Sequence, residues 1–210
     1  MERHITPINP STYLEAAQAL GRAFTDESVS KAVFSGLSPD ERTRYLTAWF
    51  AAELPIRMRW CCLPAIQEDG KICAAAAINS PGTYPLPLHE EVRIVLRTIC
   101  GAGLYGLDRW FRFANGVEKF HPKEPHYYLE FIGVEPAWQG RGLGSAILHH
   151  LAQRADDDQV GCYLETADSR NVPLYQHLHA LPSWPRSKYL RRLQANPLQM
   201  FALNHEAKNC

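Results

Sequence analysis

Apolar positions in the first half of the chain recur with two periods, which predict short strands and amphipathic helices. Residues 3–8 predict a first strand, and apolar side chains repeat at helical spacing over residues 14–24. A serine, a proline and two acids at 38–41 indicate the start of a second helix. Residues 60–67 and 72–79 predict two strands, because the segment between them contains Asp69-Gly70, a hairpin signal.

The helix that follows residues 38–41 carries an aromatic stripe that includes Trp49 and Phe50. Such a stripe is typical of a core or of one wall of a pocket, and the sequence leaves both interpretations open. Farther along, residues 89–100 and 104–120 predict two more helices, and the apolar run over residues 127–134 predicts a strand.

A glycine-rich segment, Gln139-Gly140-Arg141-Gly142-Leu143-Gly144, follows that strand and precedes a helix-forming run that begins at Ser145. A strand that enters such a turn and then a helix leaves main-chain N–H groups unpaired at the positive end of the helix dipole. This arrangement favours phosphate binding. A Walker loop is excluded, because Ser145-Ala146 stands where Lys-Ser or Lys-Thr is needed, and the G-x-G-x-G spacing fits a dinucleotide-binding turn poorly. A tight helix-entry turn without a ligand is the remaining alternative.

Composition narrows the classes of function. Lys+Arg and Asp+Glu each number 22 in 210 residues, so the formal net charge of zero argues against a partner such as nucleic acid or an anionic membrane. The six cysteines form no C-x-x-C pair, which favours reduced thiols and no metal. The N-terminus lacks an apolar signal region and no apolar run reaches the length of a membrane span, so we expect a cytoplasmic protein.

Four segments resemble those of a known family. Val134-Glu135-Pro136 with the glycine segment resembles the acetyl-CoA-binding motif Q/R-x-x-G-x-G/A of the GNAT acetyltransferase superfamily. Residues 162–166 are similar to its fifth strand and residues 171–175 to the start of its next helix. The run over residues 121–129 is similar to puromycin N-acetyltransferase-like members. The resemblance is close over residues 121–178, loose at the N-terminus and absent after about residue 179.

The resemblance implies an α/β (α+β) fold with a mixed, mostly antiparallel central sheet, flanked by helices and splayed at the acetyl-CoA site. We expect a GNAT domain over residues 1–179, in which a helical insertion over 80–120 forms the acceptor side, and an atypical tail over 180–210. The pattern of the family's last strands is absent from that tail, which indicates divergence or a frame slip near residues 178–181.

The resemblance further implies that acetyl-CoA, as co-substrate, donates its acetyl group to the primary amine of a small molecule by direct attack on the thioester. The diphosphate would lie on the main chain of residues 139–145, and the pantetheine arm would pair with the strand before it. The residues expected to bind acetyl-CoA are Ile132, Gly133, Val134, Gln139, Gly140, Arg141, Gly142, Leu143, Gly144, Ser145, Asn171 and Tyr175.

Three residues are expected to carry the chemistry. Tyr175 would protonate the leaving sulfur, although a packed structural tyrosine is the alternative. Glu130 and Glu165 are the candidate general bases, since a carboxylate inside an apolar strand can accept a proton, and Glu130 is preferred for its place near the splay. A protein N-terminus or lysine as acceptor, and an acyl-CoA-binding domain without turnover, remain alternatives. We expect a monomer or a homodimer.

Overall fold

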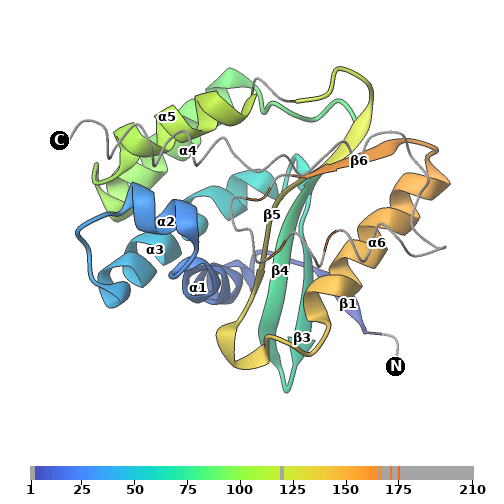
Figure 1. The fold of residues 1–210 in the computed structure, drawn as a ribbon, viewed down its shortest axis with the longest axis horizontal. Helices are drawn as coiled ribbons and strands as arrows, with labels where there is room; N and C mark the ends of the chain where they lie inside the picture. Colours follow the sequence, from blue (N-terminus) through green and yellow to red (C-terminus); the bar gives the residue numbers. More distant parts are fainter. Residues whose placement is uncertain (1–2, 119–120, 165, 167–170, 172–174, 176–210) are drawn as a thin grey trace.

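The structure is a computed structural model in which one mixed sheet carries helices on both faces (Figure 1). It describes residues 3–118 and 121–164, and with them Thr166, Asn171 and Tyr175. The described elements are, in chain order, β1 (Ile5–Pro7), α1 (Tyr13–Phe24), α2 (Ser28–Val33), α3 (Pro39–Arg57), β2 (Cys61–Cys62), β3 (Pro64–Glu68), β4 (Lys71–Asn79), α4 (Leu88–Ala102), α5 (Leu107–Glu118), β5 (His126–Val134), the 3-10 turn η1 (Pro136–Trp138), α6 (Leu143–Asp157) and β6 (Gly161–Leu164).

The sheet has the order β1-β3-β4-β5-β6, and β2 pairs with β4 beside β3. All of these pairs are antiparallel except β5 with β6, which confirms the expected mixed, mostly antiparallel sheet. The predicted hairpin is also present, because Asp69 and Gly70 at its turn have φ values of 52° and 72°. The strand predicted over residues 60–67 is interrupted at Leu63, so it forms two strands instead of one.

The starts of α1 and α3 differ in their caps. Ser38 caps α3 as expected, in a capping box with Glu41, whose carboxylate accepts the Ser38 N–H at 2.8 Å. Thr12 precedes α1 but makes no side-chain cap. The acid three residues later, Glu15, accepts the main-chain N–H of Ile72 at 3.0 Å and so ties α1 to β4.

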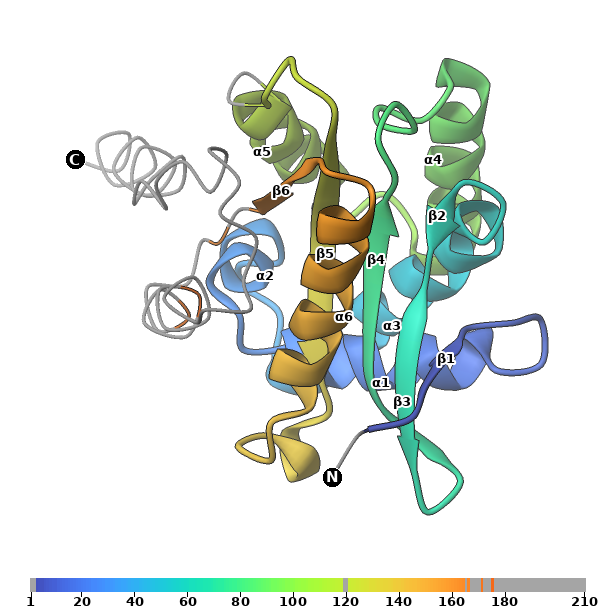
Figure 2. The same cartoon turned by 90° about the vertical axis from the view of Figure 1, so that its right-hand side faces the viewer.

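Small side chains in the centre of the sheet let helices approach it from both sides. The four alanines at 74–77 of β4 are completely buried. Ala74 and Ala76 belong to the core cluster under α6, and Ala75 and Ala77 to the cluster under α1 and α3. Figure 2 shows α6 in front of the sheet and α1 and α3 behind it. The two helices predicted over 89–100 and 104–120 are α4, which packs on α3, and α5, which contacts α2.

The neighbouring strands β5 and β6 separate in the middle of β5. The ladder between β5 and β6 ends at the pair Leu129–Leu164. One residue farther along, the pairing of β5 with β4 skips Glu130, which is the extra residue of a β-bulge before Phe131. Among the described strands, β5 therefore pairs on one side only from Glu130 to Val134. This open edge is where the sequence predicts the acetyl-CoA site.

Candidate active site

A turn with two left-handed glycines leads from the sheet into α6. Gly140 and Gly142 have φ values of 75° and 78°, and Gly142 is the N-cap of α6. A Cβ at either position would meet no atom within 4 Å, so the backbone conformation, and not crowding, requires glycine here. The open space beside these glycines is available to a ligand.

The main-chain N–H groups of this turn have no acceptor among the described residues. The last hydrogen bond before the turn joins Gln139 N to the Pro136 carbonyl at 3.4 Å, and the first after it joins Ala146 N to the Gly142 carbonyl at 3.0 Å. No described residue accepts a hydrogen bond from the N–H groups of residues 140–145. Six unpaired N–H groups at the start of a 15-residue helix form a site that suits a phosphate group.

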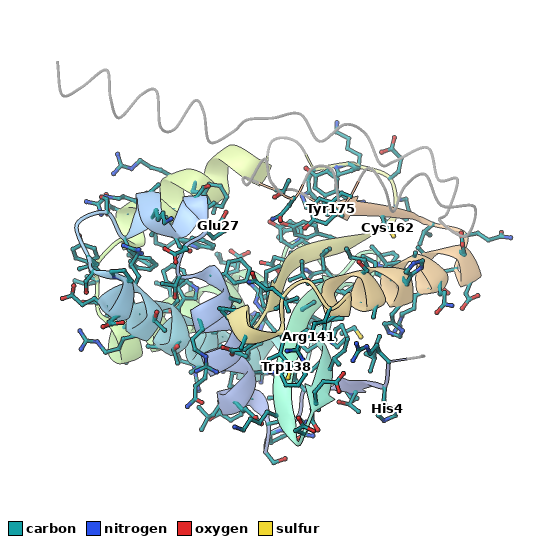
Figure 3. The ribbon with its side chains drawn as sticks, turned by 60° about the horizontal axis from the view of Figure 1, so that its bottom comes forward. His4, Glu27, Trp138, Arg141, Cys162 and Tyr175 are labelled. Atoms are coloured by element: carbon teal, nitrogen blue, oxygen red, sulfur yellow. The ribbon has the colours of Figure 1, made fainter. Side chains whose placement is uncertain are left out.

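The side chains of the turn fix its shape or lie at its rim. Leu143 is buried in the core under α6, so it anchors the helix start while its N–H faces the turn. Gln139 donates its side-chain N–H to the Val134 carbonyl at 3.1 Å. Arg141 is exposed, and its guanidinium lies 4.5 Å from the centre of the Trp138 ring. Figure 3 labels both side chains, which lie side by side. A cation at this rim can contact a bound anion.

The open edge of β5 connects this turn with the interior of the protein. Ile132 and Val134 pack against the cluster under α6, and Gly133 faces the opposite side. A Cβ added to Gly133 would lie 2.8 Å from Leu20 Cδ2 and 3.0 Å from Phe24 Cε2. Glycine at this position therefore lets α1 lie directly on β5.

A cavity of about 240 Å³ opens on the α1 and α3 side of β5. Glu130 and Ile132 line it, together with Asn171 and Tyr175, of which Tyr175 is only 7% exposed. The structure thus brings four of the predicted site residues to one cavity, while the glycine turn lies at the other end of the open edge of β5. Thr166 also lines the cavity, whereas the predicted base Glu165 lies outside the described residues.

Charged side chains meet at the cavity around Arg57, which is 8% exposed. Its guanidinium donates to Glu53 through Nε at 2.9 Å and to both carboxylate oxygens of Glu130, with Nη2 at 2.7 Å from Oε1. Asn79 donates to Glu130 at 3.0 Å, and the Cys61 thiol donates to the Asn79 side-chain oxygen at 3.0 Å. These hydrogen bonds fix the carboxylate of Glu130 in one orientation toward the cavity.

Glu53 is a site residue that the sequence reasoning missed. Its side chain is buried, and burial raises the pKa of its carboxyl group above the usual value, an effect that Arg57 opposes and Glu130 strengthens. In the sequence, Glu53 and Arg57 have the i, i+4 spacing of an ordinary surface pair. The sequence does contain one signal for a buried pair: Glu53 and Arg57 both lie among the aromatic and aliphatic residues of α3.

The aromatic stripe of α3 forms part of the core and also one wall of a pocket, the two roles that its sequence left open. Trp49 and Phe50 belong to the buried core cluster and also line the cavity. From α5, which lies within the predicted insertion over residues 80–120, Trp110 and Phe113 line the same cavity. The ring of Trp110 lies 4.8 Å from that of Trp49 in an edge-on arrangement.

The described ranges contain neither a metal site nor a membrane-spanning helix. Those ranges contain no group of three or more His, Cys, Asp or Glu side chains arranged to hold a metal ion. No described helix is both long and apolar enough to span a membrane. The cysteines at 61, 62, 73, 100 and 162 are free thiols.

Comparison with known proteins places these features in a family. Residues 30–180 match the model of the "Acetyltransferase (GNAT) family". An "Uncharacterized N-acetyltransferase" of Schizosaccharomyces pombe is 25% identical over 74% of this chain and 72% of its own length.

Solved structures share the fold. One titled "histone acetyltransferase HPA2 and related acetyltransferase", from Corynebacterium glutamicum, has a TM-score of 0.59 at 24% identity and covers 85% of this chain and 84% of its own. Arylalkylamine N-acetyltransferase 2 of Aedes aegypti has a TM-score of 0.50 at 15% identity, over 85% of this chain and 82% of its own. At these identities the likeness concerns the fold alone. With the family match over most of its length, the chain belongs to the GNAT family and is an N-acetyltransferase.

Proposed function

We propose that this protein transfers the acetyl group of acetyl-CoA to the primary amine of a small molecule. The observation that carries the proposal is the continuous arrangement of three features along β5: the unpaired N–H groups of residues 140–145, the open strand edge, and the cavity that contains Tyr175 and Glu130. Acetyl transfer needs a donor site, a path for the thioester and an acceptor site in this order.

The residues of the turn and of β5 fit acetyl-CoA. The N–H groups of residues 140–145 would hold its diphosphate, with Arg141 at the rim, and the edge from Ile132 to Val134 would pair with the pantetheine arm. Asn171 would bond the same arm, since it lines the cavity beside this edge. The thioester would supply an activated acetyl group, and the main-chain N–H of Val134 would polarise its carbonyl oxygen.

A carboxylate and a tyrosine of the cavity would carry the two protons that the acceptor nitrogen loses. The acceptor enters as an ammonium, and one of its protons passes to a carboxylate of the Glu53–Arg57–Glu130 cluster and from there to solvent. The free amine attacks the acetyl carbon as the carbon–sulfur bond breaks. The second nitrogen proton replaces the one that Tyr175 gives to the leaving sulfur.

Glu53 and Glu130 both remain candidates for the base. Glu130 lies at the bulge of β5, but its oxygens accept hydrogen bonds from Arg57 and Asn79, which favours an orienting role. Glu53 has one such bond, from Arg57 Nε, and burial raises its pKa, so we prefer Glu53 as the proton acceptor. The pH profiles of Glu53→Gln and Glu130→Gln separate the two roles, because only loss of the base removes the acidic limb of kcat/KM.

The size and lining of the cavity favour a small acceptor over a protein. A cavity of about 240 Å³ with an aromatic lining accepts one small molecule, whereas a peptide or a lysine side chain on a protein calls for an open groove. An acyl-CoA-binding domain without turnover is the second alternative, and only an enzyme would release free CoA thiol when an amine is added.

Thiol release from acetyl-CoA with a panel of amines tests the proposal. Tyr175→Phe should lower kcat at least about tenfold and leave acetyl-CoA affinity within about twofold, because it removes only the acidic hydroxyl. Tyr127→Phe is the matched control: it removes the hydroxyl of a buried tyrosine of β5 that bonds Asp158 at 2.5 Å, away from the cavity lining. Equal kcat in the two variants would remove Tyr175 from the acid role.

A further inference from the structure

The acceptor cavity combines two features that rarely occur together, an aromatic wall and a buried excess of negative charge. Rings from four elements form the wall, among them Trp49 of α3, Trp110 of α5 and Phe131 of β5. Trp49 and Trp110 pack edge-on at 4.8 Å, and Phe50 and Phe131 pack at 5.2 Å. Such a wall binds flat or bulky apolar groups, and its ring faces attract cations.

The charges at the cavity do not balance within the described residues. One guanidinium, Arg57, faces the carboxylates of Glu53 and Glu130, so the cluster has a formal charge of −1 when both acids are ionised. A third carboxylate of the lining, Glu27, is engaged elsewhere, because it accepts the N–H groups of Val29 at 2.8 Å and Ser30 at 3.2 Å at the start of α2, so it is not counted in this excess.

A buried net charge is costly unless a partner neutralises it. Burial raises the pKa of Glu53, the direction expected where a carboxylate has too little compensation. A ligand cation in the cavity would supply the missing positive charge. A ligand carboxylate would add to the excess and would be repelled.

We propose that the acceptor is a primary amine with one aromatic or bulky apolar group and no carboxylate, bound as its ammonium between the aromatic wall and the Glu53–Arg57–Glu130 cluster. This inference rests on the proposed acetyl transfer and adds the class of acceptor to it. It excludes free amino acids, because the negatively charged cluster would repel their carboxylate. It also excludes polyamine sugars, whose several cations exceed the formal charge of −1 on the described cluster and whose bulk exceeds about 240 Å³ of space.

Matched pairs of amines test the charge argument. Tryptamine and tryptophan share the indole and the amine and differ in a carboxylate, and tryptophan amide keeps the extra bulk without the charge. We expect kcat/KM to be at least tenfold higher for tryptamine than for tryptophan, and for the amide to recover most of the loss. Equal values for tryptamine and tryptophan would overturn the inference.

The aromatic wall is tested with variants of α5. Trp110→Leu and Phe113→Leu should each raise KM for tryptamine about threefold or more and leave KM for ethanolamine within twofold, because a small polar amine does not use the wall. Asp157→Asn is the control, since Asp157 is exposed at the end of α6 and does not line the cavity. Melting temperatures show which variants are folded. Unchanged KM for tryptamine in both folded variants would contradict the aromatic wall.

The amine panel distinguishes a wrong acceptor class from an absence of acetyl transfer. If acetyl-CoA binds and thiol is released with amino acids or ethanolamine as readily as with tryptamine, acetyl transfer stands and the acceptor class is wrong. If no amine in the panel releases thiol, the proposed transfer itself fails, and the acceptor class falls with it.

Discussion

Replacement of Arg57 by glutamine tests whether the charge cluster is as buried as its contacts indicate. The substitution removes the guanidinium that Glu53 and Glu130 share and leaves two carboxylates facing each other. Loss of one partner of a buried ion pair costs about 3–5 kcal/mol of unfolding free energy. The side chain of Glu130 is 20% exposed and can gain water, and Glu53 can take up a proton, so we expect the lower end, about 3 kcal/mol.

Urea unfolding at pH 7 measures this loss. With an m-value of about 2 kcal/mol/M, the midpoint should fall by about 1.5 M. The double variant Arg57→Gln/Glu53→Gln should recover a large part of the loss, because it removes the carboxylate that has the least access to water. A loss below about 1 kcal/mol in the single variant, or no recovery in the double variant, would refute the argument that the cluster is buried and coupled.

Three further results are expected. Gly133→Ala should cost about 1–3 kcal/mol in urea unfolding, because its Cβ would lie 2.8 Å from Leu20 Cδ2 and force α1 away from β5; a neutral result would mean that α1 does not pack as closely as described. His121 has its pKa lowered from 6.5 to about 4, first by burial and then by the charge of His126. The unfolded chain therefore binds this proton more readily, stability falls as pH drops from 6.5 to about 4, and His121→Phe should flatten that decline in pH-dependent melting curves; equal declines would contradict the shift. Burial raises the pKa of Cys162 to about 12, so alkylation of the native protein at pH 7.5, mapped by mass spectrometry, should label exposed Cys100 and spare Cys162; label on Cys162 would show that β6 is accessible.

Local sequence signals predicted the features that depend on local backbone conformation. The glycine turn before α6 is one case, because the positive φ values of Gly140 and Gly142 can be anticipated from the residues themselves. The hairpin at Asp69-Gly70 and the capping box of Ser38 are others. The strand over residues 127–134 was also predictable, since its apolar run is continuous.

Features that depend on distant partners could not be predicted. Glu15 has the spacing of a capping residue, yet its carboxylate bonds a main-chain N–H of β4, 57 residues away. Glu53 and Arg57 have the spacing of a surface pair, and only the packing of α3 on β5 shows that they are buried beside Glu130. The family's last strands were expected to be missing or altered after residue 179, and that expectation lies outside the described residues.

Tyr175 and Glu130 lie at one cavity, which supports a shared site for them. The proposed binding of the diphosphate rests on the N–H groups of residues 140–145, which have no acceptor among the described residues.

Calorimetric titration of the folded protein with acetyl-CoA tests the central claim most directly, with two glycine variants beside the wild type. Gly142→Ala and Gly82→Ala both place a Cβ on a residue with positive φ, 78° and 80°, and in both cases the Cβ meets no protein atom within 4 Å. The two variants therefore share the same backbone strain of about 1–2 kcal/mol. Only the first puts a methyl group into the space proposed for the diphosphate.

The account predicts binding heat with one site per chain for the wild type and for Gly82→Ala, and an affinity at least about tenfold weaker for Gly142→Ala, a change of about 1.4 kcal/mol. No heat with the folded wild type, or equal affinity in the two variants, would contradict it.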